Sequence, residues 1–286
     1  MKHRVYGYGG KPVVAFPTSE AHLNQWEDFG MVDALAPYIE EGYIQLFAMD
    51  SIDEETFFRH DRRRDKAIRR YDQYLKYITN EFMPTVIGAP GSRIPRGVYS
   101  PSGGGGVPGT LSAGAVRAAR RNARGAAHHG RSGFGSSRDS SAQKVLLTGC
   151  SMGAFHAANI YFRWPQYADS LIALSGVYTP RHFMKFDKRM SRSSFANSTL
   201  DYMSHNLDPA KRALYESSRL VFCTGQGDGE QDMLVDTIAL GEILEAQEIP
   251  AWVDVWGEDV THDWPWWTQQ MQYFLPQVLG LGDGAE

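Results

Sequence analysis

The sequence predicts an α/β fold, with a mostly parallel sheet covered by helices on both faces. The main observation is that short apolar runs alternate along the chain with segments of helical periodicity. Of the 286 residues, 42% are hydrophobic and 22% are charged, which suits a chain that buries a large core. No run of about 18 apolar residues occurs, so the sequence predicts no membrane-spanning helix. We expect a single domain over residues 1–286.

The first predicted elements alternate between strand and helix. Lys11–Phe16 is a short apolar strand, and Met31–Glu41 has helical spacing and ends at Gly42. Tyr43–Met49 is the next strand, and Asp65–Phe82 reads as an amphipathic helix. The apolar face of that helix carries Ile68, Tyr71, Leu75 and Ile78.

The second set of elements continues this alternation. Lys144–Thr148 is predicted as a strand, Met152–Arg163 as a helix and Ser170–Leu174 as a strand. Strands that alternate with helices favour parallel pairing with crossover helices. The remaining predicted elements are the strand Arg219–Thr224, the helix Asp232–Ala246, the strand Ala251–Trp256 and the helix Trp264–Leu279.

A segment of different composition interrupts the pattern at residues 88–143. Residues 91–143 contain eight Arg, one Asp and no Lys or Glu, so this part has a net charge of +7. We expect an irregular insert rich in Gly, Ser and Arg, with at most a short helix over residues 113–124. It could be a basic arm for an anionic partner, a tolerated surface insertion, or the product of a GC-rich reading frame read out of register.

The rest of the chain carries a charge of −11 within a total of −4. An acidic body argues against nucleic-acid binding. Cys150 and Cys223 are the two cysteines, too few for a disulfide framework or a four-thiolate zinc site. Because the N-terminus lacks the apolar run of a secretory signal, we expect a cytoplasmic protein. We expect no membrane partner.

The strongest chemical signal is the G-x-S-x-G motif centred on Ser151. It follows an apolar strand and opens a helix, which is the setting of a nucleophile elbow. The tight turn would expose the serine hydroxyl near the helix N-terminus, where main-chain N–H groups can stabilise an oxyanion. The purely structural alternative is an ordinary Gly-rich strand–helix turn, and the surrounding elements favour the elbow.

A nucleophilic serine needs a base, and His262 is the best candidate. It follows the strand Ala251–Trp256 across a short loop, at the edge of the sheet where α/β sites are built. His182 and His205 are the other histidines downstream of the motif and its helix. A lone histidine is more often a surface or capping residue, but the presence of the elbow favours a catalytic role.

The acid is expected after the preceding strand, within a Gly-rich turn. Asp228 is our choice, because its carboxylate could fix the tautomer of His262 and stabilise the imidazolium. Asp232 is the alternative acid, although it suits a helix cap. We expect the N–H groups of Met152 and Ser19 to form the oxyanion hole, while Thr18 and Ser19 could instead form a simple polar turn.

Several stretches together resemble the esterase branch of the α/β-hydrolases, which includes S-formylglutathione hydrolase, feruloyl esterases and mycolyltransferases. The stretches are YGYGGKPVVAFPTSEAHLNQWEDFGM, VLLTGCSMGAFHAANIYFRWP, IALSGVY, FCTGQGD and IPAWVDVWGEDVTHDWPWW. The resemblance implies one domain with a three-layer α/β-hydrolase sandwich, ester substrates and no cofactor, and we expect no metal. It also implies Ser151 as nucleophile, Asp228 as acid and His262 as base. The insert is a departure from the pattern.

These observations together predict a serine carboxyl-ester hydrolase that acts on a small-molecule ester through an acyl-enzyme on Ser151. An acyltransferase would use the same residues and differ only in the acyl acceptor. A non-catalytic binding protein on a hydrolase scaffold is the alternative from another class, since fold does not fix function. The presence of candidates for all three triad positions favours the enzyme.

Overall fold

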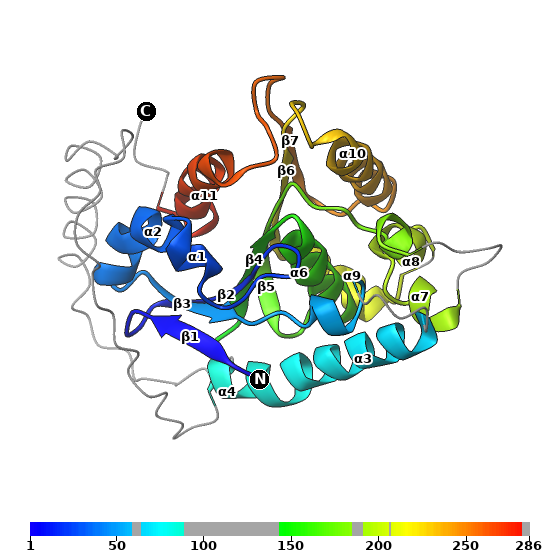
Figure 1. The fold of residues 1–286 in the computed structure, drawn as a ribbon, viewed down its shortest axis with the longest axis horizontal. Coiled ribbons are helices and arrows are strands. Elements are labelled where there is room, and N and C mark those ends of the chain that lie inside the picture. The colour runs from blue at the N-terminus through cyan, green and yellow to red at the C-terminus, as the bar shows by residue number, and fades with distance from the viewer. Residues whose placement is uncertain (59–63, 89–142, 185–190, 206, 282–286) are drawn as a thin grey trace, which may run out of the picture.

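A computed structural model describes residues 1–58, 64–88, 143–184, 191–205 and 207–281 of the chain. Nearly all of the expected insert, including the short helix expected at 113–124, lies outside these residues. The elements are arranged in three layers, with the sheet in the middle (Figure 1). No helix in the described part of the chain is both long and apolar enough to cross a lipid bilayer.

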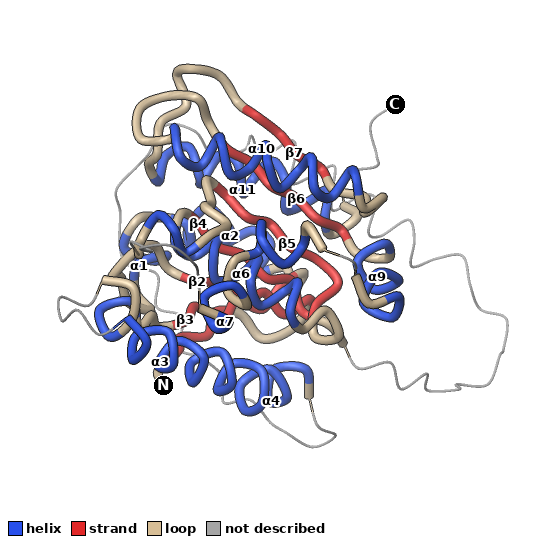
Figure 2. The backbone as a smooth tube through the Cα atoms, turned by 90° about the vertical axis from the view of Figure 1, so that its right-hand side faces the viewer, coloured by secondary structure: helices blue, strands red, loops and turns tan. Residues whose placement is uncertain are grey.

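The described residues form one sheet of seven strands in the order β1-β3-β2-β4-β5-β6-β7. β1 pairs antiparallel with β3, and all other neighbours are parallel. The strands change direction progressively across the sheet, as the right-handed twist of strands requires (Figure 2). The strands are β1 (His3–Tyr6), β2 (Lys11–Phe16), β3 (Ile44–Met49), β4 (Val145–Cys150), β5 (Ala168–Leu174), β6 (Arg219–Thr224) and β7 (Trp252–Val255).

The helices divide between the two faces of the sheet. α1 (Gln25–Asp28), α2 (Met31–Glu40) and α11 (Trp264–Val278) cover one face, and the larger set covers the other (Figure 1). That larger set contains α3 (Arg64–Tyr77), α4 (Met83–Ile87), α6 (Met152–Arg163), α8 (Thr199–Met203), α9 (Pro209–Glu216) and α10 (Gln231–Ala246). Short elements complete the fold: α7 (Arg192–Phe195), the 3₁₀ helices η1 (Asp53–Glu55) and η3 (Pro180–His182), and the π-helical turn η2 (Ile78–Phe82).

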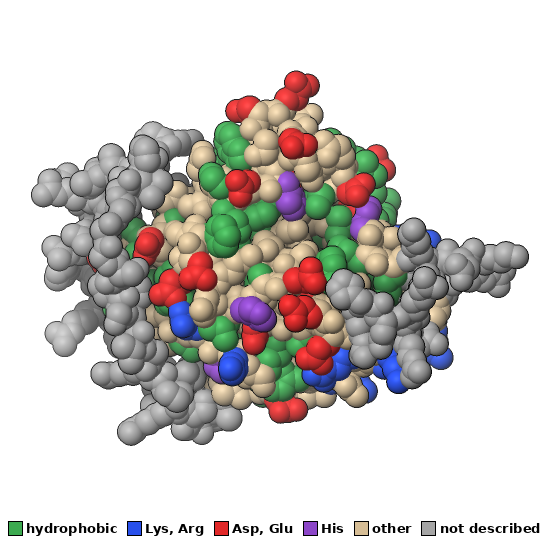
Figure 3. Space-filling model, in the orientation of Figure 1, with side chains coloured by type: hydrophobic (Ala, Val, Ile, Leu, Met, Phe, Trp, Pro, Cys, Tyr) green, Lys and Arg blue, Asp and Glu red, His purple; other side chains and the backbone are tan. Residues whose placement is uncertain are grey.

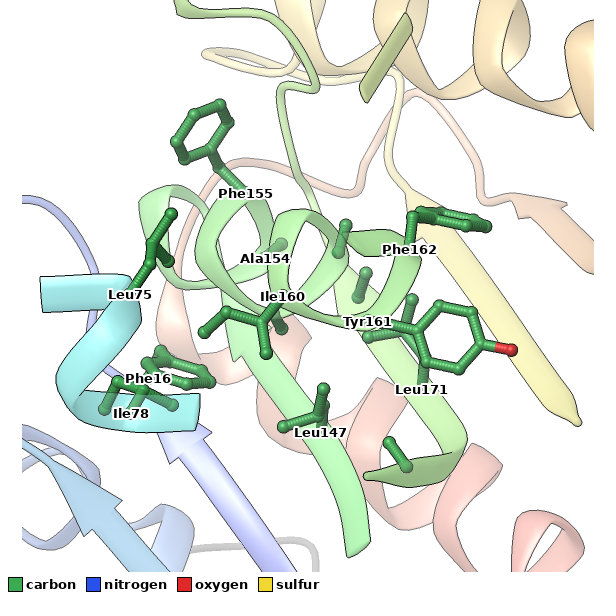
Figure 4. Close-up of a cluster of buried hydrophobic side chains, with 14 of the residues drawn as sticks. Phe16, Leu75, Ile78, Leu147, Ala154, Phe155, Ile160, Tyr161, Phe162 and Leu171 are labelled. Atoms are coloured by element: carbon green, nitrogen blue, oxygen red, sulfur yellow. The ribbon is translucent and has the colours of Figure 1, made fainter. Parts of the chain in front are cut away.

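Alternation along each strand sends neighbouring side chains into two separate cores. In β2, Val14 and Phe16 join the core beneath α3 and α6, whereas Val13 and Ala15 join the core beneath α1, α2 and α11. Figure 4 shows the first core, in which Leu147 and Leu171 of the sheet lie under α6. Both faces are therefore buried, which explains why the strands read as continuous apolar runs.

The predicted α/β-hydrolase sandwich agrees with this fold. β2 has the predicted bounds, and β3, β4, β5, β6 and β7 lie within two residues of theirs. The helix expected at Asp65–Phe82 is longer, because η2 and α4 continue it to Ile87. β1 was missed, as it is four residues long and partly exposed.

Candidate active site

Ser151 lies at the turn between β4 and α6, with φ 56° and ψ −121°. This backbone conformation is unfavourable for a residue with a side chain and persists only where its surroundings impose it. The two glycines of the motif allow the close backbone contacts that impose it. A Cβ on Gly149 would lie 2.3 Å from the carbonyl carbon of Gly153, and a Cβ on Gly153 would lie 2.4 Å from the carbonyl oxygen of Phe16. The turn can therefore close this tightly only with glycine at both positions.

The N-terminus of α6 offers main-chain donors beside the Ser151 hydroxyl. Among the described residues, the N–H of Met152 has no acceptor. In the loop after β2, the N–H of Thr18 is bonded to the side chain of Gln25 at 2.8 Å, whereas the N–H of Ser19 has no acceptor in the described part of the chain. Since a Cβ on Gly153 would also meet the Pro17 carbonyl oxygen at 2.7 Å, this loop runs against the start of α6. Met152 and Ser19 stay predicted oxyanion donors.

His262 reaches Ser151 from the loop between β7 and α11. Its Nε2 lies 2.9 Å from the Ser151 Oγ, across 111 positions of sequence. The ring stands edge-on to the Trp267 indole, with 4.9 Å between ring centroids. A Cβ on Gly229 would come within 2.9 Å of the His262 Cβ, so the chain at Gly229 also packs closely on this residue. Contacts with Trp267 and with Gly229 therefore hold His262 against the serine.

The carboxylate that meets His262 is that of Glu230. Its Oε1 lies 3.2 Å from the His262 Nδ1, and its side chain is fully buried. The second oxygen accepts a hydrogen bond from the Thr224 hydroxyl at 2.7 Å. The Ser175 hydroxyl, which accepts from the Trp267 indole N–H at 2.8 Å, also helps to lower the pKa of this carboxyl. Glu230 is thus held in one position by a contact on each of its two oxygens.

This geometry corrects the expectation for the acid. Asp228 is exposed, and its main-chain oxygen rather than its carboxylate meets His262, accepting from the N–H at 3.0 Å. Asp232 is also exposed and lies 3.4 Å from the Nδ1 of His182. The Gly-rich turn directs Asp228 outward, and the chain turns Glu230 inward only at the start of α10. Carboxylates stand at every second position of this segment, at 228, 230 and 232. Their spacing alone could not show which of the three meets His262.

The glycines of the turn let it pack directly on the histidine loop. A Cβ on Gly225 would lie 2.2 Å from the carbonyl oxygen of Val260, and one on Gly227 would lie 2.7 Å from the same oxygen. Main-chain hydrogen bonds then join the two loops, from Gly227 N–H to Val260 at 2.9 Å and from Gln226 N–H to Gly257 at 3.2 Å. The pairing holds Glu230 and His262 on one rigid unit.

Residues next to Ser151 and His262 in the sequence contribute packing. Cys150 is fully buried, and burial raises the pKa of its thiol well above the ordinary value, which makes it unreactive. Trp264 and Trp267 are also buried at the start of α11, so they support the loop from inside. Within the described residues, no three His, Cys, Asp or Glu side chains are grouped so that they could hold a metal ion.

Burial alone would raise the pKa of the Glu230 carboxyl, but hydrogen bonds from His262, Ser175 and Thr224 outweigh it. The pKa is therefore lower than its ordinary value of 4.5. A carboxyl whose pKa is lower in the folded chain stabilises the fold above its unfolded pKa, and this contribution is lost as the pH falls through the folded value.

We therefore expect the Glu230 carboxylate to stabilise the protein fully above pH 4.5 and progressively less below it. The measurement is urea unfolding of wild type and Glu230→Gln at several pH values from about 7 down to about 3. The difference in unfolding free energy between the two should shrink as the pH falls below 4.5. A difference that stays constant with pH would contradict the lowered pKa.

Comparison with known proteins supports the fold assignment. No family model matches the sequence, and no curated protein sequence matches it. Among solved structures, a ferulic acid esterase is similar with a TM-score of 0.57 at 15% identity, over 96% of this chain and 86% of that one. An S-formylglutathione hydrolase from Agrobacterium tumefaciens has a TM-score of 0.57 at 12% identity, over 97% and 88%.

A ferulic acid esterase from the anaerobic fungus Anaeromyces mucronatus gives a third match, with a TM-score of 0.53 at 10% identity over 96% of this chain and 80% of that chain. At these identities the likeness concerns the fold. The described residues of the chain have the α/β-hydrolase fold.

Proposed function

We propose that this protein is a serine carboxyl-ester hydrolase with Ser151, His262 and Glu230 as its catalytic triad. The observation that carries the proposal is the pair of contacts made by one imidazole: 2.9 Å from Nε2 to the Ser151 Oγ and 3.2 Å from Nδ1 to Glu230. These three side chains come from separate loops at the same edge of the sheet. Nothing in core packing requires a serine, a histidine and a buried carboxylate in series, whereas nucleophilic catalysis does.

The geometry supports the following sequence of steps. Ser151 Oγ attacks the ester carbonyl carbon while His262 Nε2 takes its proton, and Glu230 stabilises the imidazolium through Nδ1–H. The carbonyl oxygen becomes an oxyanion that the N–H groups of Met152 and Ser19 would bind. Collapse of this intermediate breaks the bond to the alcohol, which receives the proton from His262. Water then attacks the acyl-enzyme with the same base and releases the carboxylic acid.

The surroundings of the triad favour substrates without negative charge. The two loops that hold His262 and Glu230 carry exposed carboxylates at Asp228, Glu258 and Asp259, and the sequence contains no Lys or Arg after Arg219. Acidic side chains are spread over the face shown in Figure 3, and most Lys and Arg side chains lie in its lower half. Because like charges repel across a low-dielectric site, we begin with neutral short-chain esters as test substrates.

The test of the nucleophile is labelling with a fluorophosphonate, which reacts with an activated serine and needs no knowledge of the natural substrate. Peptide mass spectrometry should locate the adduct on Ser151. His262→Ala should lose the label, because the serine then has no base. Cys150→Ala is the matched control and should be labelled like wild type, since the thiol is buried. A folded wild-type protein that gives no adduct, or an adduct elsewhere, would refute the proposal.

A further inference from the structure

A hydrogen-bonded network of buried polar side chains lies behind the proposed active site and is not part of the triad. His156, five residues after Ser151 on α6, lies with its Nε2 3.0 Å from the Asp53 Oδ1. Its Nδ1 lies 2.9 Å from the Tyr71 hydroxyl. All three side chains are at most 1% exposed. Burying such groups is unfavourable unless each finds a partner, whereas apolar side chains would fill the same space without that requirement. The network therefore requires an explanation beyond packing.

The Asp53 end of this hydrogen-bonded network reaches the loop that carries the predicted oxyanion donor Ser19. The second oxygen of Asp53 accepts a hydrogen bond from the main-chain N–H of Glu20 at 3.3 Å. Glu20 has φ 56°, a left-handed conformation that is uncommon for a residue with a side chain. Glu20 is itself exposed, so its own side chain does not impose this conformation. The bond to Asp53 acts on the peptide next to Ser19, within a turn that the Ala21 N–H closes on the Thr18 oxygen at 3.3 Å.

The two oxygens of Asp53 therefore join the two halves of the predicted oxyanion hole. One oxygen is bound to α6, whose first residue, Met152, supplies one N–H. The other is bound to the loop in which Ser19 supplies the second N–H. Oxyanion donors act only when they are held where the charge develops, and a displacement of an ångström removes much of their effect.

We propose that Asp53 is a positioning residue that holds the Ser19 N–H in register with the N-terminus of α6. The inference rests on the proposed function, because it concerns how the same site stabilises an oxyanion. Asp53 does not touch the substrate and acts through the Glu20 peptide. His156 binds the other carboxylate oxygen of Asp53, and Tyr71 contacts only the far nitrogen of His156. Because a carboxylate only accepts hydrogen bonds, the His156 Nε2 is the protonated nitrogen, and Nδ1 accepts from Tyr71.

The chemistry of the network predicts which variants should work. In Asp53→Leu, a side chain of similar shape offers no acceptor to Glu20. In Asp53→Asn, the amide oxygen can still accept from Glu20, and the amide nitrogen can donate to His156 Nε2 if the ring switches tautomer. Tyr71→Phe is the matched control, since it also removes a buried hydrogen bond of the chain but leaves the contact with Glu20 in place.

The experiment measures kcat and KM for a neutral ester, together with the inhibition constant of a trifluoromethyl ketone, whose serine adduct places an oxyanion in the hole. We expect Asp53→Leu to lower kcat about 10²-fold and to weaken the inhibitor by a similar factor, with KM changed less than about threefold. Asp53→Asn and Tyr71→Phe should stay within about fivefold of wild type. Thermal unfolding of every variant separates these effects from lost stability.

Hydrogen exchange tests the same contact without relying on activity. In wild type the Glu20 amide should exchange slowly and the neighbouring Ser19 amide quickly, and Asp53→Asn should keep this difference. A Glu20 amide that exchanges as fast as that of Ser19 would overturn the proposal even if Asp53→Leu did not fold. A folded Asp53→Leu variant with wild-type kcat would also overturn it. The same holds for a Tyr71→Phe variant whose kcat falls as far as that of Asp53→Leu. If the wild-type protein shows no ester hydrolysis that is lost on replacing Ser151, the proposed function itself is refuted instead.

Discussion

Replacement of Ser151 by alanine is expected to lower kcat for a neutral ester by about 10⁵-fold or more. The substitution removes the attacking oxygen and leaves the base with nothing to activate. It keeps the Cβ, so it adds no new strain at φ 56° and should leave the turn between β4 and α6 intact. The remaining rate would come from the oxyanion hole and substrate binding.

Steady-state hydrolysis of a p-nitrophenyl ester, corrected for the rate in buffer, measures this loss. Ser19→Ala is the control, because the proposed role of Ser19 uses its main-chain N–H, which alanine also has. It should keep kcat within about threefold of wild type. A Ser151→Ala protein with more than about a hundredth of the wild-type rate would show that the turnover comes from another site.

Most of the fold followed from sequence because both faces of the sheet are buried. A strand covered on both faces is a continuous apolar run, and such runs, as in β4 and β6, are easy to recognise. β1 was missed because it lies at the edge of the sheet and carries His3 and Arg4. The short helices α7 and α8 were missed because so few residues show no periodicity.

The end of the long helix before the insert shows how tertiary packing overrides a local signal. The pattern of α3 was expected to stop at Phe82, two residues before Pro84. The chain instead continues through the π-turn of η2 into α4, where Pro84 occupies the first turn. Met83 and Val86 are buried, and this packing favours the extension.

The site was predictable where a motif or a sheet position constrains it, and not where loops fold in three dimensions. Ser151 and His262, both chosen from the sequence, lie in contact. The expected contact of Asp228 with His262 is made by Glu230 instead, because Asp228, Glu230 and Asp232 are equivalent by position along the chain. Which of them points inward depends on how the glycines of the turn pack against Val260. The contact between Asp53 and His156 spans 103 positions and leaves no pattern in the sequence.

Glu230 and Asp228 give opposite predictions when each is replaced by its amide. Glu230→Gln is expected to lower kcat by about 10⁴-fold, although the side chain keeps its shape. A glutamine can donate from its amide nitrogen to the His262 Nδ1, which would leave the proton of the neutral ring on Nε2. The nitrogen that faces Ser151 at 2.9 Å could then no longer take the serine proton. The loss is thus one of tautomer as well as of charge.

Asp228→Asn is the matched control, because it removes one carboxylate from the same turn without touching the imidazole. Its main-chain oxygen still accepts from the His262 N–H, so kcat should stay within about threefold of wild type. Glu230→Asp adds a test of reach, since its carboxylate is one methylene shorter and would withdraw from an Nδ1 that is already 3.2 Å away. If Asp228→Asn lost activity and Glu230→Gln kept it, the outward-facing aspartate would have to turn inward during catalysis, and Glu230 would be left with a structural role.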